Sequence, residues 1–294
     1  MTFVCYGKLN RSEIMGAADE TTRSIGGEVS EDAVKIRHLG RSKLFSYAGN
    51  SNCGAEVFDA LRGEFSKSMP FMDYIDLSAR VFKKTRSAYK ASDVKRCKTD
   101  DERATVEKAY SNENEDIGLI FNLDIMLAGF DPTIGEFKIY YVGGSGEKKS
   151  APNRIGCIGY SDAVIKGVSV LKEYLEKFRG ENVPREVFAR ALLDATDQAR
   201  KIDLGGDGKA AGSTQLIIVD SHGKSTEFSR DKTNFLTRTI RQNRKKVPGV
   251  DDKYMENAFG DIILKGIQPK NFWDKLPAKV RNEIGFYTST DMTL

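Results

Sequence analysis

Residues 3–18 read FVCYGKLNRSEIMGAA, and this stretch decides the fold. Two runs rich in β-forming residues, 3–9 and 13–18, flank the polar break Asn10-Arg11-Ser12. Parallel strands need a crossover connection of a dozen or more residues, whereas antiparallel strands can be joined by a short turn. The stretch therefore predicts two antiparallel strands at the start of the chain.

The same pattern continues outward from this pair. Residues 33–39 and 43–48 flank Gly40-Arg41-Ser42, which is typical of a hairpin. A helix over 53–65 should follow, because apolar residues recur there at helical spacing. Further along we expect strands at 118–129, 136–142, 154–159 and 214–220 and amphipathic helices at 164–175 and 188–199. Antiparallel strands in blocks, with helices grouped between them, indicate an α+β layered fold rather than a parallel doubly wound sheet.

Two segments differ from this pattern. Residues 66–116 are polar and charged, so we interpret them as an insertion with helical pieces at 75–82 and 104–109 and an exposed stretch at 83–101. The net charge of +4 comes entirely from residues 231–294, which hold 12 basic and 8 acidic residues. We therefore expect a domain at 2–230 and a basic helical extension at 231–294, whose removal leaves a folded core.

The extension contains the densest basic run of the chain. Arg238, Arg241 and Lys245 fall on one helical face by their spacing, and Arg244 and Lys246 lie beside them. Such a run can bind nucleic acid. A pI near 8.7 is too mild to favour that interpretation. We interpret the run as a solvated helix face or a contact with a protein partner.

Composition excludes several classes of protein. Four widely spaced cysteines rule out a cysteine-dense scaffold, and two histidines argue against a histidine-based metal site, so we expect no metal and no cofactor. The phosphate-binding loop, the G-x-S-x-G elbow and the H-E-x-x-H motif are absent. No apolar run approaches the ~20 residues of a membrane span, and the N-terminus lacks a signal-peptide pattern. We expect a cytoplasmic protein with reduced thiols and no membrane contact.

The second residue offers a different kind of chemistry. Methionine aminopeptidases generally remove the initiator when a side chain as small as that of Thr2 follows it. The exposed α-amine would have a pKa near 8, so a useful fraction is neutral and can act as a base. It can take the proton of the threonine hydroxyl through a water, so that one residue supplies both nucleophile and base.

Four pieces of the sequence occur in a telling order: Thr2, Met15-Gly16-Ala17-Ala18-Asp19, Lys35 and Ala48-Gly49-Asn50. In order and spacing they resemble the β-subunits of the proteasome and the HslV-type protease, which are N-terminal nucleophile (Ntn) hydrolases. The resemblance covers about residues 2–225. Asp19 departs from it, because it lies one residue later relative to Thr2 than in the family.

The resemblance implies a four-layer αββα sandwich of two antiparallel sheets and a proteasome-like threonine peptidase. Thr2 would be the nucleophile and its own amine the base. Lys35 would stabilise the alkoxide as a cation, and Asp19 would keep Lys35 charged and oriented. The Gly49 N–H would donate to the oxyanion, a contact typically worth ~3 kcal/mol of barrier. Peptide bonds would be cleaved through an acyl-threonine intermediate.

Further residues are assigned by the resemblance alone. The residues that would support the terminal amine are Tyr160, Ser161, Asp207 and Ser213. Tyr160 stands where the family has serine, which weakens this support. The residues that would line the pocket for the side chain before the cut are Thr22, Ala33, Tyr47 and Ser51. Tyr47 would form the floor, so we expect a preference for small or medium side chains.

Two alternatives stay open. A transferase or ligase similar to the methanogen connectases would pass the acyl group to an amine instead of water. A scaffold subunit would never free Thr2 and would have no catalysis. For the peptidase, the expected partners are a peptide or unfolded-protein substrate, further copies of the chain in a ring or other homo-oligomer, and an ATPase or other protein bound through residues 231–294. Nucleic acid is not among them.

Overall fold

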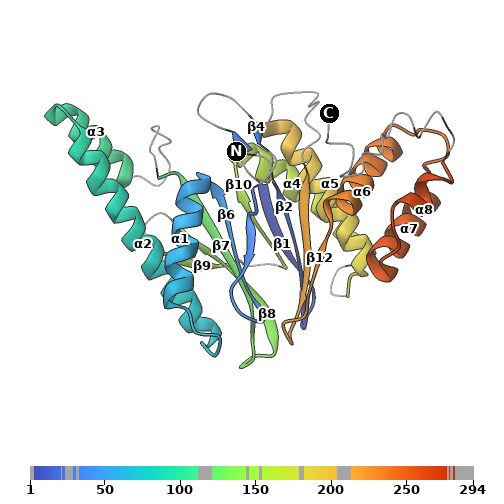
Figure 1. Ribbon diagram of the computed structural model, residues 1–294, viewed down its shortest axis with the longest axis horizontal. Helices are drawn as coiled ribbons and strands as arrows, with labels where there is room; N and C mark the ends of the chain where they lie inside the picture. The colour runs from blue at the N-terminus through green and yellow to red at the C-terminus, as the bar shows by residue number, and fades with distance from the viewer. Residues whose placement is uncertain are drawn as a thin grey trace.

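The computed structural model describes residues 3–20, 22–23, 29–30, 33–111, 121–143, 146–151, 154–178, 182–203, 213–276, 278 and 281. Two five-stranded antiparallel sheets form its centre (Figure 1). The first sheet has the strand order β10 (Ile155–Gly159), β1 (Phe3–Asn10), β2 (Glu13–Asp19), β11 (Thr214–Asp220) and β12 (Ser225–Phe228). The pair β1 and β2 is antiparallel, with Cys5 opposite Ala17, as residues 3–18 predict.

The second sheet has the strand order β5 (Ile36–His38), β6 (Lys43–Gly49), β7 (Leu123–Asp131), β8 (Glu136–Val142) and β9 (Lys148–Ser150). A separate two-stranded ribbon consists of β3 (Thr22–Arg23) and β4 (Val29–Ser30). Strand β5 is shorter than the expected run over 33–39 and begins only at Ile36.

Helices cover the outer face of each sheet, so the molecule has four layers (Figure 1). The helices on the second sheet are α1 (Ser51–Glu64) and α2 (Phe71–Arg96), and α3 (Asp100–Ser111) follows them. Those on the first sheet are α4 (Ser161–Leu175), a 3-10 turn (Glu176–Phe178) and α5 (Arg185–Asp203). The expected α+β sandwich of two antiparallel sheets is confirmed. None of the described helices is both long and apolar enough to cross a membrane.

Alternation along β1 explains the layers. Phe3 and Cys5 point into the hydrophobic cluster that contains α4 and α5, whereas Val4 and Tyr6 point into the cluster between the two sheets. Successive side chains of a strand point to opposite faces, so a strand that is apolar at every position is buried on both. The first strand therefore requires a layer on each side of its sheet.

The described part of the segment 66–116 is mostly helical. Helix α2 is continuous over 71–96, and its first half buries Phe71, Tyr74 and Phe82 against the second sheet. The Tyr74 hydroxyl donates to the Leu44 carbonyl at 2.8 Å. The two helical pieces predicted from the sequence are thus parts of longer helices. The predicted pieces are too short because the charged residues after Phe82 obscure the helical period.

The C-terminal residues are helical, as expected. They form α6 (Arg230–Arg244), α7 (Asp252–Phe259), a π-helical turn (Gly260–Leu264) and α8 (Lys270–Trp273). Phe235, Leu236, Met255 and Phe259 belong to the same hydrophobic cluster as α4 and α5. That residues 231–294 can be removed from a folded core stays a prediction. The domain boundary near residue 230 stays a prediction.

The basic run on α6 is not simply a solvated face. Arg241 and Arg244 both bind the carboxylate of Asp197 on α5, with nitrogen–oxygen distances down to 2.5 Å, and the Asp197 side chain is buried. The spacing of the arginines shows which residues share a helix face, but it cannot show an acidic partner 44 residues earlier in the chain. These two arginines therefore join the extension to the core.

Candidate active site

Four strand ends lie side by side at one end of the first sheet, which we call the strand edge. Strand β1 begins at Phe3, opposite Gly159 at the end of β10. Strand β2 ends at Asp19, opposite Thr214 at the start of β11. Thr2 itself lies outside the described residues and directly precedes Phe3 in the chain. The topology therefore brings the start of the chain and the predicted carboxylate to the same edge.

The Lys35 segment is tied to this edge by hydrogen bonds between the sheets. Gln215 on β11 holds both backbone groups of Ile36: its Nε2 donates to the carbonyl at 2.9 Å, and its Oε1 accepts from the N–H at 2.9 Å. The Ala33 N–H donates to the Glu20 carbonyl at 3.2 Å. Lys35 lies between these two anchors, and it is fully buried, with 0% of its surface exposed.

Asp19 has a partner that sequence reasoning missed. Its side chain is buried (1% exposed), and its Oδ1 accepts from Nε of Arg200 on α5 at 3.0 Å. The Nη2 of the same guanidinium donates to the Ser213 carbonyl and to the Thr214 hydroxyl, both at 2.9 Å. Arg200 is itself 2% exposed. In the sequence, Arg200 is marked only by its position directly after Ala199, a residue on the apolar face of a predicted helix.

The predicted oxyanion donor lies at the end of β6. Gly49 is opposite Leu123, has a φ of 107°, and is followed by Asn50, whose N–H donates to the Asn122 carbonyl at 2.7 Å. The Asn50 side chain caps α1 by accepting from the N–H groups of Asn52 and Cys53. Gly49 therefore stands at the N-terminal, electropositive end of α1.

The predicted support residues are distributed differently. Tyr160 precedes α4 and is 42% exposed, and Ser161 is exposed at the first helical position. Ser213 is buried, and its carbonyl is shared by Arg200 and the Glu20 N–H. Asp207 lies outside the described residues. The part of each residue in supporting the terminal amine stays a prediction.

Two of the predicted pocket residues, Tyr47 and Ser51, lie near the start of α1. The Tyr47 ring is buried against Gly54 of α1, and a Cβ atom added to Gly54 would come within 2.5 Å of a ring carbon. Burial raises the pKa of the Tyr47 hydroxyl, and Arg37 opposes that rise. Ser51 begins α1, Ala33 is half-buried, and Thr22 lies in β3 with only its backbone described. Their role in substrate specificity stays a prediction.

Cysteines and histidines lie in other surroundings. Cys5 and Cys157 face each other across β1 and β10 with their sulfur atoms 2.8 Å apart, and burial raises the pKa of the Cys5 thiol well above its usual range. His222 lies in the turn after β11, at the opposite end of that strand from Thr214. Within the described ranges, no three His, Cys, Asp or Glu side chains are grouped closely enough to hold a metal ion.

Gly49→Ala tests the backbone of the site. We expect it to lower the free energy of unfolding by more than about 1 kcal/mol, because alanine is strained at a positive φ. Its Cβ would also lie 2.2 Å from the Asn122 carbonyl oxygen. The matched control is Gly63→Ala near the end of α1, where a Cβ meets nothing within 4 Å. Urea unfolding should show the control to be neutral or more stable; equal stability of both variants contradicts the strain argument.

The layer order and the strand topology define an α+β sandwich of two antiparallel sheets with helices on both outer faces (Figure 1). Among solved structures, the chain is similar to a Gly-1 mutant of Anbu from Hyphomicrobium sp. strain MC1, with a TM-score of 0.53 and 14% sequence identity. The match covers 90% of this chain and 96% of the Anbu chain. No protein-family model matches the sequence, and no curated protein matches it. At this identity the likeness concerns the fold alone.

Proposed function

We propose that this protein is an N-terminal threonine peptidase that cleaves peptide bonds through an acyl-threonine intermediate. The observation that carries the proposal is the pair of buried charged residues, Asp19 and Lys35, at the strand edge where β1 begins one residue after Thr2. Aspartate and lysine are almost never fully buried unless they are paired, and such groups cluster at functional sites.

The reaction would use the chain's own groups throughout. With Met1 removed, the α-amine of Thr2 accepts the hydroxyl proton through a water, and the hydroxyl oxygen attacks the substrate carbonyl carbon. Lys35 stabilises the charge on the threonine oxygen, and the N–H of Gly49 donates to the oxyanion. The C–N bond then breaks, and the protonated amine gives its proton to the leaving amine. A water hydrolyses the acyl-threonine ester with the same amine as base.

Helix α1 supports the oxyanion end of this scheme. The N-terminus of a helix carries a partial positive charge from its unpaired N–H groups. The Asn50 side chain occupies the N–H groups of Asn52 and Cys53, so the chain enters the helix in a fixed direction directly after Gly49. An oxyanion next to Gly49 would be stabilised by this end of the helix.

Covalent trapping with a peptide epoxyketone tests the proposal, because this reagent captures the hydroxyl and amine of one residue in a single ring. We expect intact-mass spectrometry to show loss of Met1 and one adduct, which peptide mapping assigns to Thr2. The controls Cys5→Ala and Cys157→Ala should form the adduct at the wild-type rate. Retention of Met1 on all of the protein, or an adduct on a cysteine, contradicts the proposal.

We also propose that the protein assembles into a homo-oligomer, as the resemblance to ring-forming proteases implies. The exposed face of the extension 231–294 is then the candidate contact surface for an ATPase or another protein. Light scattering of the purified protein measures the assembly directly. A monomeric mass at all concentrations contradicts it and would favour a chain that acts alone.

A further inference from the structure

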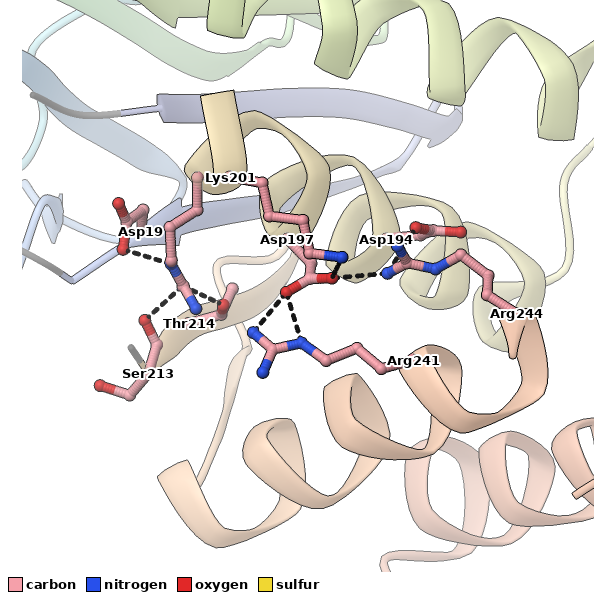
Figure 2. A network of polar contacts seen from close by, with 9 residues as sticks. Asp19, Asp194, Asp197, Lys201, Ser213, Thr214, Arg241 and Arg244 are labelled. Atoms are coloured by element: carbon pink, nitrogen blue, oxygen red, sulfur yellow. Dashed lines mark hydrogen bonds and ion pairs between the residues drawn. The ribbon is translucent and has the colours of Figure 1, made fainter. Parts of the chain in front are cut away.

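We infer that Arg200 is a positioning residue of this site, which holds the Asp19 carboxylate and adds a permanent positive charge to the surroundings of the nucleophile. The inference rests on the proposed function. Arg200 comes from α5, which packs on the outer face of the first sheet (Figure 1). Its guanidinium reaches the end of β2 and the start of β11 at once, through Asp19, Ser213 and Thr214 (Figure 2).

The contact geometry fixes this guanidinium. Three of its hydrogen bonds, at 2.9–3.0 Å, end on a carboxylate, a backbone carbonyl and a hydroxyl. Arginine keeps its charge at every pH at which enzymes work and presents its donors in a rigid fork. Because Asp19 and Arg200 are both buried, water screens their attraction little. The carboxylate of Asp19 is therefore held by a permanent cation that the proteasome-like scheme does not include.

The charge balance of the edge changes as a result. A lysine and an aspartate alone form a neutral pair, whereas Lys35, Asp19 and Arg200 together carry a surplus positive charge. A nearby positive charge favours the deprotonated form of a group. The surplus would lower the pH at which the amine and hydroxyl of Thr2 lose their protons. Arg200 would thus act on the nucleophile through Asp19 and Lys35 and touch neither substrate nor reacting atoms.

Several described carboxylates near this end of the sheet have cations of their own. Glu20, the next residue after Asp19, is matched by Arg230 of α6, with Nε 3.2 Å from its carboxylate. Asp197, one turn before Arg200 on α5, is matched by Arg241 and by two further cations (Figure 2). Those cations are Lys201 and Arg244, and Arg244 also contacts Asp194. Glu227 of β12 also faces this region, and its Oε1 accepts from the Nε2 of Gln215 at 3.1 Å.

The experiment measures the pH dependence of the rate at which the epoxyketone adds to Thr2. We expect Arg200→Gln to move the midpoint of this profile upward by about one pH unit, because one positive charge is lost. Asp19→Asn should move it downward by a similar amount. The double variant Asp19→Asn with Arg200→Gln removes one charge of each sign, so its midpoint should return close to that of the wild type, although the rate is lower.

The matched control is Arg241→Gln, which also removes a partly buried arginine but one that binds Asp197. It should lower the melting temperature without moving the midpoint. Equal midpoints in the wild type, Arg200→Gln and Asp19→Asn overturn the inference, as does a shift caused by Arg241→Gln. If Arg200→Gln does not fold, the test is the midpoint in the other two variants. It should move downward in Asp19→Asn and return close to the wild-type value in the double variant. A wild type that forms no Thr2 adduct instead overturns the proposed function, and this inference with it.

Discussion

Thr2→Ala is expected to abolish the cleavage of an alanyl peptide reporter, with a loss of about four orders of magnitude or more in kcat/KM. The substitution removes the hydroxyl that the proposed mechanism uses as nucleophile, and residues that act as one unit lose nearly all of the rate when a single one is removed. Initial rates of reporter cleavage, measured with the enzyme in excess over the reporter, give the change in kcat/KM. The fold should persist, because only one methyl and one hydroxyl group are removed, from a residue that precedes β1 in the chain.

Two controls make this result specific. Thr2→Ser keeps both the hydroxyl and the α-amine, so it should retain measurable cleavage. Cys5→Ala should cleave at close to the wild-type rate, because the raised pKa of this buried thiol keeps it protonated. Full activity of Thr2→Ala would refute the assignment of the nucleophile and leave only the fold.

Strands bounded by turns and rich in β-branched or aromatic residues could be predicted to the residue. Strands β8 (136–142) and β11 (214–220) have the bounds that the sequence indicates. Strand β9 (Lys148–Ser150) could not be predicted, since its exposed residues are held by pairing with β8 rather than by a pattern of their own. The two-residue strands β3 and β4 are too short to show a pattern and are defined by their pairing with each other.

The candidate site divides along a similar line. The resemblance to proteasome β-subunits, based on the spacing of Asp19, Lys35 and Gly49, predicts that these residues share a site. In the structure Asp19 and Gly49 end strands, and Lys35 directly precedes one. Arg200 and Gln215 could not be found in this way. Their partners, Asp19 and Ile36, lie 181 and 179 residues away in the chain, so no local pattern connects them.

Arg200 also changes what removal of Lys35 should do. From the sequence alone, Lys35→Ala leaves Asp19 as a buried carboxylate without a counter-charge, which is costly. In the structure, Asp19 still has the guanidinium of Arg200 at 3.0 Å. Lys35→Ala should therefore reduce the rate of cleavage much more than it reduces stability. We therefore expect the rate to depend mainly on Lys35 and the stability of this site mainly on the pairing of Asp19 with Arg200.

Helix α5 links the site to the C-terminal extension. Arg200 binds the strand edge, and one turn earlier Asp197 binds the arginines of α6 (Figure 2). The extension therefore packs on the helix that supplies the partner of Asp19. In keeping with this arrangement, the buried apolar residues described between 235 and 276 belong to the hydrophobic cluster of α4 and α5.

Asp197→Ala is expected to lower the free energy of unfolding by about 3 kcal/mol or more. The substitution leaves Arg241 and Arg244, both largely buried, without the carboxylate that they share, and breaking a buried ion pair on one side typically costs 3–5 kcal/mol. The matched control is Asp252→Ala. That carboxylate binds Arg190 but is 78% exposed, so its loss should cost less than about 1 kcal/mol. Urea unfolding at pH 7 measures both.

The pH dependence of stability separates Asp197 from its neighbour Asp194. Burial pushes the pKa of Asp197 upward, but the hydrogen bonds and charges of Arg241 and Arg244 outweigh it and hold the pKa below the usual value. Its stabilisation is thus present above the unfolded-state pKa of about 4 and is lost as pH falls below that. Burial raises the pKa of Asp194, so ionisation of this carboxyl reduces the free energy of unfolding as pH rises above about 4. Wild-type protein should lose stability between pH 4 and pH 2 more steeply than Asp197→Ala, and parallel curves would show that Asp197 carries no such ion pair.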